Sequence, residues 1–256
     1  MLLPAKEFKN FKLSAKDGDI GKAKEFLFDD HFWIVRYLVA DTADWLTGRL
    51  VLISPYALKP ANLMEKTLPV NLTKKQIEES PSIETHQPVS RQYETQFYGY
   101  YGWPYYGYGP YSWGLSPELI RNQESWEAGT RRQEAWDPNL RSTNDVIGHH
   151  IRAIDGDVGH VEDFILDEET WSIRYLLVNT KNWGSGKHLL VSPQWIKRVS
   201  WEESKVFVNQ SVDVLKKSPE YLLETLNRDY ETRLYRHYNW QGYWVDELAA
   251  RELVQK

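Results

Sequence analysis

The feature that most constrains the fold of this 256-residue chain is an internal repeat. When the chain is shifted by 138 positions, Asp17-Gly18-Asp19-Ile20-Gly21 aligns with Asp155-Gly156-Asp157-Val158-Gly159. Over the 65 ungapped positions of 17–81 about one in three is identical, whereas about four matches would arise by chance. After Pro81 the shift becomes 137. Each copy is about 100 residues long, which predicts a duplicated domain, because solenoid repeats are shorter and more numerous.

Each copy is expected to begin with β-structure. Runs of β-branched and aromatic residues predict strands at Phe11–Ala15, Ile20–Phe28, Trp33–Ala40, Arg49–Ile53, Ile196–Trp201 and Lys205–Val208. Asp17-Gly18 and Asp29-Asp30-His31 predict hairpin turns between them. About six short strands with tight turns favour a small closed barrel in each copy, because closure removes exposed strand edges.

A helix is expected after the strands of each copy. Apolar side chains recur with helical spacing at Val89, Tyr93, Phe97 and Tyr101, and again at Leu226, Tyr230, Leu234 and Tyr238. The predicted fold class is therefore mainly β with appended helices, as two small barrels related by duplication. The predicted domains are 1–103, an aromatic then polar linker at 104–139, the second domain at 140–244, and a short amphipathic helical tail at 245–256.

The repeated segments resemble the PRC-barrel family. The resemblance rests on four segments of each copy, which are Asp17–Gly21, Phe26–Asp29, Trp33–Val39 and Val51–Pro55, and Asp155–Gly159, Val161–Asp167, Trp171–Val178 and Leu189–Pro193. The family includes the cytoplasmic domain of the photosynthetic reaction centre H subunit and the barrel domain of a ribosome-maturation factor. The resemblance implies small β-barrels used for protein–protein contact, with no shared catalytic residues.

Composition and charge exclude several classes of function. The chain has no cysteine, which excludes disulfides, cysteine-ligated metals and thiol nucleophiles. Its net charge of −5 disfavours a nucleic-acid partner. It shows no signal peptide, and no apolar run approaches the roughly 20 residues that span a bilayer, so a cytoplasmic location is expected. No cofactor is predicted.

Two groups of residues could be considered as metal ligands. A calcium loop at Asp17 and Asp19 is disfavoured, because the alternating oxygen ligands and the final glutamate are missing. The histidines His149, His150 and His160 would form a site private to the second copy, although their spacing matches no common metal motif.

Arg36 and Arg174 each interrupt an apolar strand. They are expected to point outward, with an interface or ligand anchor as the alternative.

The aromatic residues fall into two groups among 12 Trp and 16 Tyr. Trp33, Trp45, Tyr37 and their counterparts recur in both copies, which predicts packing. The run 97–113 is irregular, and three interpretations stay open: packing between the domains, a surface for a partner, or a platform for sugars. The candidate surface residues are Trp103, Tyr105, Tyr106, Tyr108, Tyr111 and Trp113.

The leading functional prediction is a non-enzymatic scaffold or protein-interaction protein with an unidentified protein partner, and a homo-oligomer is compatible with it. The first alternative is a small-ligand or carbohydrate binder that uses exposed Trp and Tyr. The second alternative is an enzyme or metal site private to the second copy.

Overall fold

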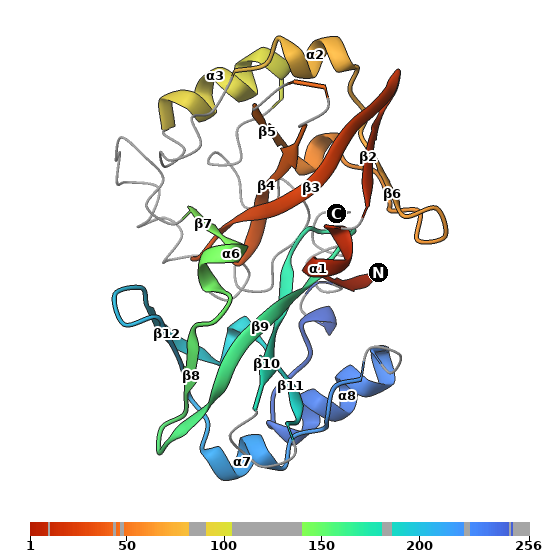
Figure 1. The fold of residues 1–256 in the computed structure, drawn as a ribbon. Helices are drawn as coiled ribbons and strands as arrows, with labels where there is room; N and C mark the ends of the chain where they lie inside the picture. The colour runs from red at the N-terminus through yellow and green to blue at the C-terminus, as the bar shows by residue number, and fades with distance from the viewer. Residues whose placement is uncertain are drawn as a thin grey trace, which may run out of the picture. The chain divides into compact units, whose positions relative to one another are not determined.

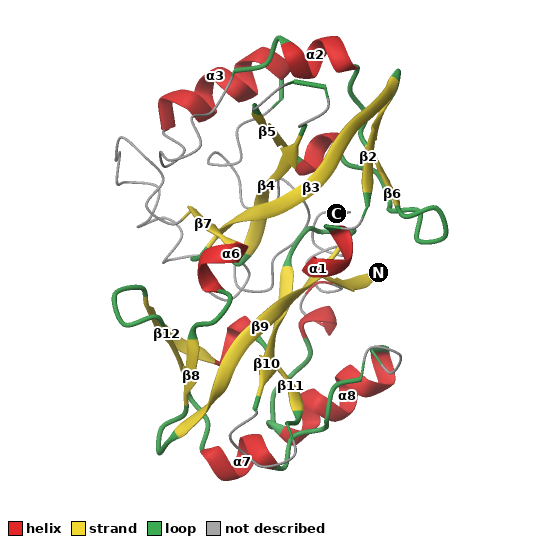
Figure 2. Cartoon of the chain, in the orientation of Figure 1, coloured by secondary structure: helices red, strands yellow, loops and turns green. Residues whose placement is uncertain are grey.

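The computed structural model describes residues 1–9, 11–42, 45–46, 49–81, 91–103, 140–180, 186–222, 226–245 and 247, without the side chains of 91–93 and 95. The chain divides into two compact units. Unit 1 comprises Met1, Leu3–Thr143 and Asp167–Ser172. Unit 2 comprises Leu2, Asn144–Leu166 and Ile173–Lys256. Both units are mainly β (Figure 2).

Unit 1 is built on one sheet with the strand order β5-β4-β3-β2-β6, and β7 pairs with β3 (Figure 1). Strand β2 is antiparallel to β3 and parallel to β6. The elements in chain order are β1 (Leu2–Pro4), α1 (Ala5–Phe8), β2 (Lys12–Ala15), β3 (Gly18–Asp29), β4 (Ile34–Asp41), β5 (Leu50–Ile53), the 3-10 helix η1 (Pro55–Ala57), β6 (Thr67–Pro69), α2 (Lys74–Glu78), α3 (Arg91–Tyr101) and β7 (Leu140–Ser142).

Unit 2 has a sheet with the strand order β11-β10-β9-β8-β13-β12. Its elements are α6 (Thr143–Val146), β8 (His150–Arg152), β9 (Asp157–Asp167), β10 (Ile173–Asn179), β11 (His188–Val191), the 3-10 helix η4 (Pro193–Trp195), β12 (Ile196–Ser200), β13 (Lys205–Val208), α7 (Val212–Lys216) and α8 (Arg228–His237). The first residue of α6 belongs to unit 1 and the rest to unit 2. The six strands predicted from the sequence are all present, with ends that differ by at most two residues.

The prediction of closed barrels is wrong, because neither sheet closes on itself. Within the described residues, β5 and β6 are the two ends of the strand order in unit 1, and β11 and β12 are the two ends in unit 2. These end strands are only three to five residues long. Short edge strands limit the number of unpaired backbone groups, so the edges are protected without closure.

The repeated Asp-Gly-Asp-x-Gly motif shapes the first hairpin of each unit. Ala15 pairs with Gly18, so the two-residue turn is Lys16-Asp17 and not the predicted Asp17-Gly18. Gly18 begins β3 with a φ of 140°. The Asp17 carboxylate accepts a hydrogen bond from the backbone N–H of Lys74 at 2.7 Å, and Asp155 does the same for Val212 at 2.8 Å. The first aspartate of the motif therefore holds the first turn of α2 or α7, which explains it without calcium.

Gly21 and Gly159 end this motif where two strands approach closely. A Cβ at Gly21 would lie 1.9 Å from the backbone oxygen of Asp41, and one at Gly159 would lie 2.0 Å from that of Asn179. Gly21 also has a φ of 117°, which side chains rarely adopt. Glycine at both positions is therefore required by the crossing of β3 with β4 and of β9 with β10.

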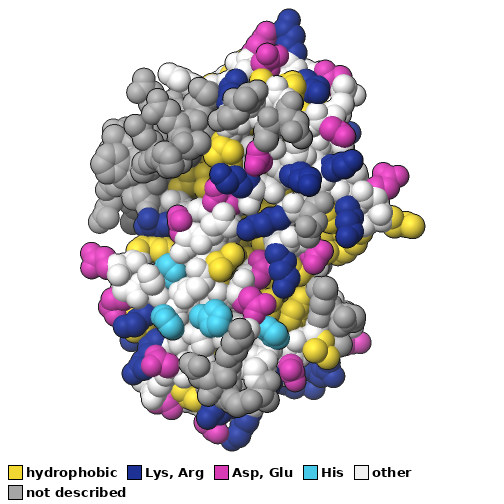
Figure 3. Space-filling view, viewed as in Figure 1, with side chains coloured by type: hydrophobic (Ala, Val, Ile, Leu, Met, Phe, Trp, Pro, Cys, Tyr) yellow, Lys and Arg dark blue, Asp and Glu magenta, His cyan; other side chains and the backbone are white. Residues whose placement is uncertain are grey.

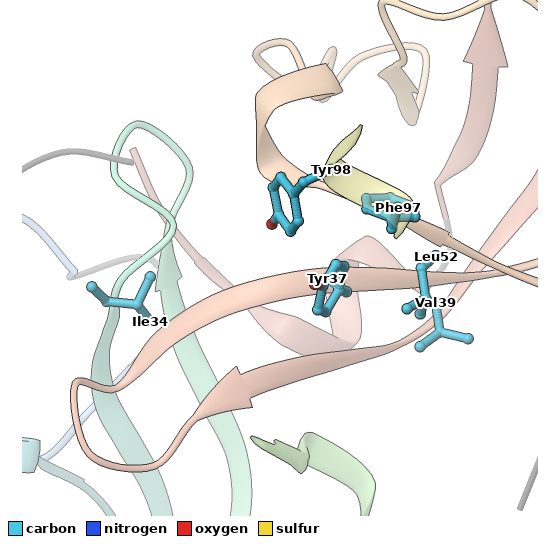
Figure 4. Packing of buried hydrophobic residues seen from close by; sticks show 6 residues of the cluster. All are labelled: Ile34, Tyr37, Val39, Leu52, Phe97 and Tyr98. Carbon is cyan, nitrogen blue, oxygen red and sulfur yellow. The ribbon is translucent and has the colours of Figure 1, made fainter. Parts of the chain in front are cut away.

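One hydrophobic core cluster of unit 1 lies between β4, β5 and α3 (Figure 4). Every residue of β4 from Ile34 to Ala40 is buried, so this strand is covered on both faces. Phe97 and Tyr98 of α3 pack on Tyr37, with ring centroids 5.5 and 6.2 Å away. In unit 2, α8 buries Tyr230, Leu234 and Tyr235. The predicted helices are confirmed as α3 and α8, although Val89 lies outside the described residues.

The prediction that Arg36 and Arg174 point outward is wrong. Arg36 is 5% exposed and its Nη2 lies 3.2 Å from Asp29 Oδ2. Arg174 is 4% exposed and its Nη2 lies 2.5 Å from Glu247 Oε1. Because β4 and β10 are buried on both faces, an arginine there needs a buried carboxylate as its partner.

The matched aromatic residues mostly pack as predicted. Trp33 and Tyr37 are buried, whereas Trp45 is half-buried. Trp33 and Trp171 also share a left-handed backbone, with φ of 57° and 55°. Of the predicted tail helix at 245–256, Val245 and Glu247 are helical, and the other residues of the tail lie outside the described residues. None of the helices in the described ranges is long and apolar enough to cross a membrane.

Candidate interaction site

Of the six predicted surface residues, Trp103 is described. Tyr105, Tyr106, Tyr108, Tyr111 and Trp113 lie outside the described residues. Trp103 is half-buried and follows the C-terminal end of α3. It packs against Tyr101, Phe97 and Tyr56 of unit 1, with ring centroids 4.4, 6.4 and 5.7 Å away. The structure thus places one predicted residue in an aromatic cluster.

The end of α3 fixes the position of Trp103. Gly102 has a φ of 67°, the left-handed conformation that commonly follows a helix. The Trp103 N–H donates to the Tyr98 carbonyl at 3.0 Å, and the Gly102 N–H donates to the Gly99 carbonyl at 3.3 Å. These two bonds form a Schellman motif, which turns the chain sharply and directs Trp103 back over the helix end.

A cavity of about 340 Å³ opens beside Trp103. We call it the Trp103 pocket; it is lined by Tyr56, Asn71, Leu72, Gln76, Tyr100, Tyr101 and Trp103. The Tyr101 and Trp103 rings are stacked, with 13° between their planes. Asn71 and Gln76 add exposed side-chain amides. The pocket therefore combines flat aromatic surface with hydrogen-bonding groups, as small-ligand and peptide sites do.

Short helices hold the walls of the Trp103 pocket in place. Tyr56 lies in η1, whose first turn is capped by the Ser54 hydroxyl. Gln76 lies in α2, which begins with a capping box between Thr73 and Gln76. The Tyr100 hydroxyl donates to the Gln76 carbonyl at 2.9 Å and so ties α3 to α2. The pocket residues of η1 and α2 therefore lie in capped helices, and a hydrogen bond joins α2 to α3.

The Trp103 pocket is uncharged at neutral pH. None of the described residues that line it is acidic or basic. Burial raises the pKa of Tyr101 to about 12, and burial followed by the charge of Glu79 raises the pKa of Tyr100. Both phenols therefore keep their protons, and both hydroxyls donate them to the Gln76 carbonyl. The site fits a neutral ligand better than an ionic one.

The corresponding place in unit 2 is built differently. Tyr56 and Ala57 align with Gln194 and Trp195. Trp195 is buried, and its ring centroid lies 4.2 Å from that of Tyr238, which aligns with Tyr101. The indole thus packs where unit 1 has only the methyl group of Ala57. Unit 2 folds with Gln194 at this position, so the shared fold does not dictate a tyrosine at position 56.

The predicted histidine site does not come together as a metal centre. His149 is buried and packs on Trp201 at 5.7 Å, whereas His150 is exposed and is the cross-strand partner of half-buried His160. Among the described residues, no three His, Asp or Glu side chains are placed to hold a metal. Figure 3 shows several histidine side chains at the surface of unit 2.

His149 is expected to make unit 2 sensitive to acid. Its Nε2 has no hydrogen-bond partner among the described residues. Burial lowers its pKa, the carboxylate of Asp145 acts in the opposite direction, and His150 lowers it further. Because the folded pKa lies below the unfolded value of about 6.5, the unfolded state takes up the proton first as the pH falls. Stability is therefore lost below about pH 6.5.

The test of this acid sensitivity uses the residue found at the equivalent position of unit 1, Phe11. We expect His149→Phe to remove a slope of up to about 1.4 kcal/mol per pH unit below pH 6.5. Urea unfolding of both proteins between about pH 5 and 8 measures the difference. An identical pH dependence in the two proteins would show that His149 does not titrate in this way.

The geometry of unit 2 defines a small β-sheet domain with a helix packed on it. The family model of the PRC-barrel domain matches residues 138–215, which span β7 to α7. A PRC-barrel domain is therefore present in this part of the chain. No curated protein matches the chain.

Most of the Trp103 pocket was not predicted from the sequence. Tyr56, Asn71 and Gln76 were not proposed as site residues, and Tyr100 and Tyr101 were considered only as part of the run 97–113. A usable signal was nevertheless present in the repeat. Within well-matched segments, Tyr56 aligns with Gln194, Gln76 with Val214 and Tyr100 with His237. Such differences at otherwise shared positions identify side chains that the fold does not dictate.

Proposed function

We propose that this chain is a non-enzymatic protein-interaction or scaffold protein that binds a partner protein through the Trp103 pocket. The observation that carries the proposal is the uncharged aromatic pocket in unit 1, whose lining residues Tyr56, Gln76 and Tyr100 are replaced by Gln194, Val214 and His237 in unit 2. The PRC-barrel domain at 138–215 supports it, because this domain suggests an interaction module. The proposal assigns no catalytic residue.

The proposal includes an architecture and a location. It retains two PRC-barrel domains related by duplication, at 1–103 and 140–244, with a linker at 104–139 and a tail at 245–256. Support for the duplication comes from the identities between the copies and from a similar order of strands, 3-10 helix and helices in both units, although unit 2 has two strands, β12 and β13, where unit 1 has β6. The bacterial cytoplasm is the proposed location, which agrees with a chain that lacks cysteine.

The chemistry of the pocket suits the centre of a protein interface. Tyr and Trp are enriched among residues that dominate binding energy, and charged residues are depleted at interface cores. Tyr56, Tyr101 and Trp103 supply rings, while Asn71 and Gln76 can pair with the backbone of an extended segment. The partner segment is therefore expected to be uncharged and to insert an apolar or aromatic side chain.

The test replaces pocket residues by those that unit 2 carries. We expect Tyr56→Gln with Tyr100→His to reduce capture of the partner from a native lysate at least about tenfold, equivalent to about 1.4 kcal/mol. Thermal unfolding should change little, because unit 2 folds with Gln194 and His237 at these positions. Met64→Ala is the matched control, since Met64 is 97% exposed on unit 1 and outside the pocket.

Two results would overturn the proposal. One is equal capture of the same partner by the wild-type chain and the double variant. The other is a saturable hit in a thermal-shift screen of small molecules when no partner is captured. The second result would favour the alternative of a small-ligand or carbohydrate binder, which the stacked Tyr101 and Trp103 rings beside two amides also support.

A further inference from the structure

A turn in unit 1 carries the most exposed large hydrophobic side chain among the described residues. The turn is Leu63–Lys66, directly before β6, and we call it the Met64 turn. Met64 is 97% exposed and its neighbour Leu63 is 39% exposed. Figure 1 shows the turn as a loop that projects beside β6. Two adjacent aliphatic side chains on a projecting turn are unfavourable in water and gain free energy when another surface covers them.

The backbone holds the Met64 turn in a defined conformation. Asn62 and Thr67 exchange two backbone hydrogen bonds, of 2.8 and 3.1 Å. The Asn62 side-chain oxygen accepts hydrogen bonds from the N–H groups of Met64 and Glu65, both at 3.1 Å. Lys66 ends the turn with a left-handed φ of 51°. The turn is therefore ordered before it meets a partner, so little conformational entropy is lost on binding.

Lysines lie beside the Met64 turn on the exposed face of the sheet. The Lys12 N–H donates to the Lys66 carbonyl at 2.9 Å, and Lys12 is the cross-strand partner of Lys22. Lys24 follows Lys22 on the same face of β3, which runs antiparallel to β2 and so toward the turn. We call Lys12, Lys22, Lys24 and Lys66 the lysine row. Figure 3 shows Lys and Arg side chains gathered over β2 and β3.

The lysine row is a local excess of positive charge in a chain whose net charge is −5. All four side chains are exposed, and within the part of the chain that the structure describes their ammonium groups contact no carboxylate. The acidic side chains beside the row include Glu65 in the turn and Asp41, the partner of Lys22 on β4. Like charges directly opposite each other, as at Lys12 and Lys22, destabilise a sheet. The row therefore does not serve the stability of unit 1.

Unit 2 forms the same turn without the aliphatic side chains and without the row. Ser204 aligns with Lys66 and has nearly the same φ, 50° against 51°. The aligned residues of unit 2 for Met64, Lys12, Lys22, Lys24 and Lys66 are Glu202, His150, His160, Glu162 and Ser204. The shared fold thus requires neither the exposed methionine nor the lysines.

We infer that the Met64 turn and the lysine row dock this chain on the surface of an anionic lipid bilayer. Leu63 and Met64 would enter the boundary between headgroups and acyl chains, as the apolar side of interfacial segments does. The lysine ammonium groups would stay at the level of the lipid phosphates, because long basic side chains keep their charge in water. A protein partner fits this surface less well, since lysine is depleted at protein interfaces.

The first test measures cosedimentation of the full chain with vesicles of phosphatidylcholine that contain about 30% phosphatidylglycerol. We expect saturable binding that falls as salt rises and is at least about tenfold weaker with phosphatidylcholine alone. Met64→Glu introduces the residue of unit 2 and should weaken binding at least about tenfold, because a carboxylate replaces the inserted side chain. Ile154→Glu is the matched control and should change binding less than about twofold. Ile154 is 68% exposed but belongs to unit 2.

The second test changes the charge of the surface. Lys12→His with Lys66→Ser introduces two residues of unit 2 and should weaken binding at least about tenfold at about pH 8, where an unperturbed histidine is neutral. Lys197→Gln with Lys217→Gln removes two exposed lysines of unit 2 and should change binding less than about twofold. Glu65→Gln should strengthen binding about threefold, because it removes a negative charge from the turn.

A fluorescent probe reports whether the turn enters the bilayer. The chain has no cysteine, so Met64→Cys can be labelled with an environment-sensitive dye, which should shift to shorter wavelength on anionic vesicles. The same dye on Ile154→Cys should not shift. Tyr56→Gln with Tyr100→His should leave vesicle binding unchanged, because the Trp103 pocket shares no residue with this surface. Failure of bilayer docking and failure of partner capture are therefore distinguishable.

Four results would overturn the inference. They are no cosedimentation at about 5 mM anionic lipid, a concentration that reveals even weak interfacial binding, equal binding to neutral vesicles, unchanged binding of Met64→Glu, and no dye shift at position 64. Capture of a soluble protein that Met64→Glu abolishes, without vesicle binding, would assign the turn to a protein interface instead. Thermal unfolding of Met64→Glu should match that of the wild-type chain, since unit 2 folds with Glu202.

Discussion

Replacing Gly21 by alanine is expected to lower the free energy of unfolding of unit 1 by about 4 kcal/mol or more, a loss that only severe structural conflicts produce. The new methyl group would lie 1.9 Å from the Asp41 carbonyl oxygen, which belongs to a paired strand and cannot rotate away. The φ of 117° adds strain for any side chain. Urea denaturation followed by tryptophan fluorescence measures the effect.

The matched control for this prediction is Gly99→Ala. Gly99 lies in α3 with nothing within 4 Å of a Cβ, so alanine should stabilise the helix by about 0.5–1 kcal/mol. Gly159→Ala should reproduce the effect of Gly21→Ala in unit 2, where the methyl group would lie 2.0 Å from the Asn179 oxygen. An unchanged urea midpoint for Gly21→Ala would contradict the close approach of β3 and β4.

Replacing Glu231 by alanine is expected to destabilise unit 2 by about 2–5 kcal/mol, because it leaves two buried tyrosine hydroxyls without their acceptor. Glu231 is 2% exposed. Its Oε1 accepts hydrogen bonds from the hydroxyls of Tyr175 at 2.7 Å and Tyr243 at 2.9 Å, and Arg228 lies 3.0 Å from Oε2. Burial raises the pKa of Tyr175 well above 10, so this hydroxyl keeps its proton and needs an acceptor.

The control for Glu231→Ala is Glu220→Ala, an exposed glutamate of unit 2 whose loss should change stability by less than about 0.5 kcal/mol. Tyr175→Phe and Tyr243→Phe should each cost about 1 kcal/mol, since each removes one buried hydrogen bond. Urea unfolding of all four variants separates these contributions. If Glu231→Ala were as stable as Glu220→Ala, the buried network would contribute nothing to folding.

The β-structure and the helices could be predicted because they depend on local patterns. Two copies of the stripe that contains Tyr230 and Leu234 carried independent information about one helix, and α8 is confirmed. The turn at Lys16-Asp17 and the role of Gly21 could not be predicted, because both depend on which strand crosses β3. The repeated Asp-Gly-Asp-x-Gly motif indicated that this hairpin is structurally constrained, but it did not reveal that the close approach of β4 is the reason.

Arg36 and Arg174 show why strand alternation failed. The prediction assumed a sheet with one exposed face, but β4 and β10 are buried on both faces. The buried partners Asp29 and Glu247 lie at very different distances along the chain from their arginines. The partner of a buried arginine is determined by tertiary contacts, and these cannot be predicted from the periodicity of hydrophobic residues. The same reason explains the Trp103 pocket, whose walls come from η1, α2 and α3.

The open space around Gly99 has a practical consequence for spectroscopy. The chain contains no cysteine, so Gly99→Cys would create a unique thiol without removal of any native one. Gly99 is exposed on α3, two residues before Tyr101 of the Trp103 pocket, and the added side chain would meet nothing within 4 Å. A fluorophore or spin label attached there would sit beside the pocket without disturbing its packing, and would test directly whether the proposed partner binds there.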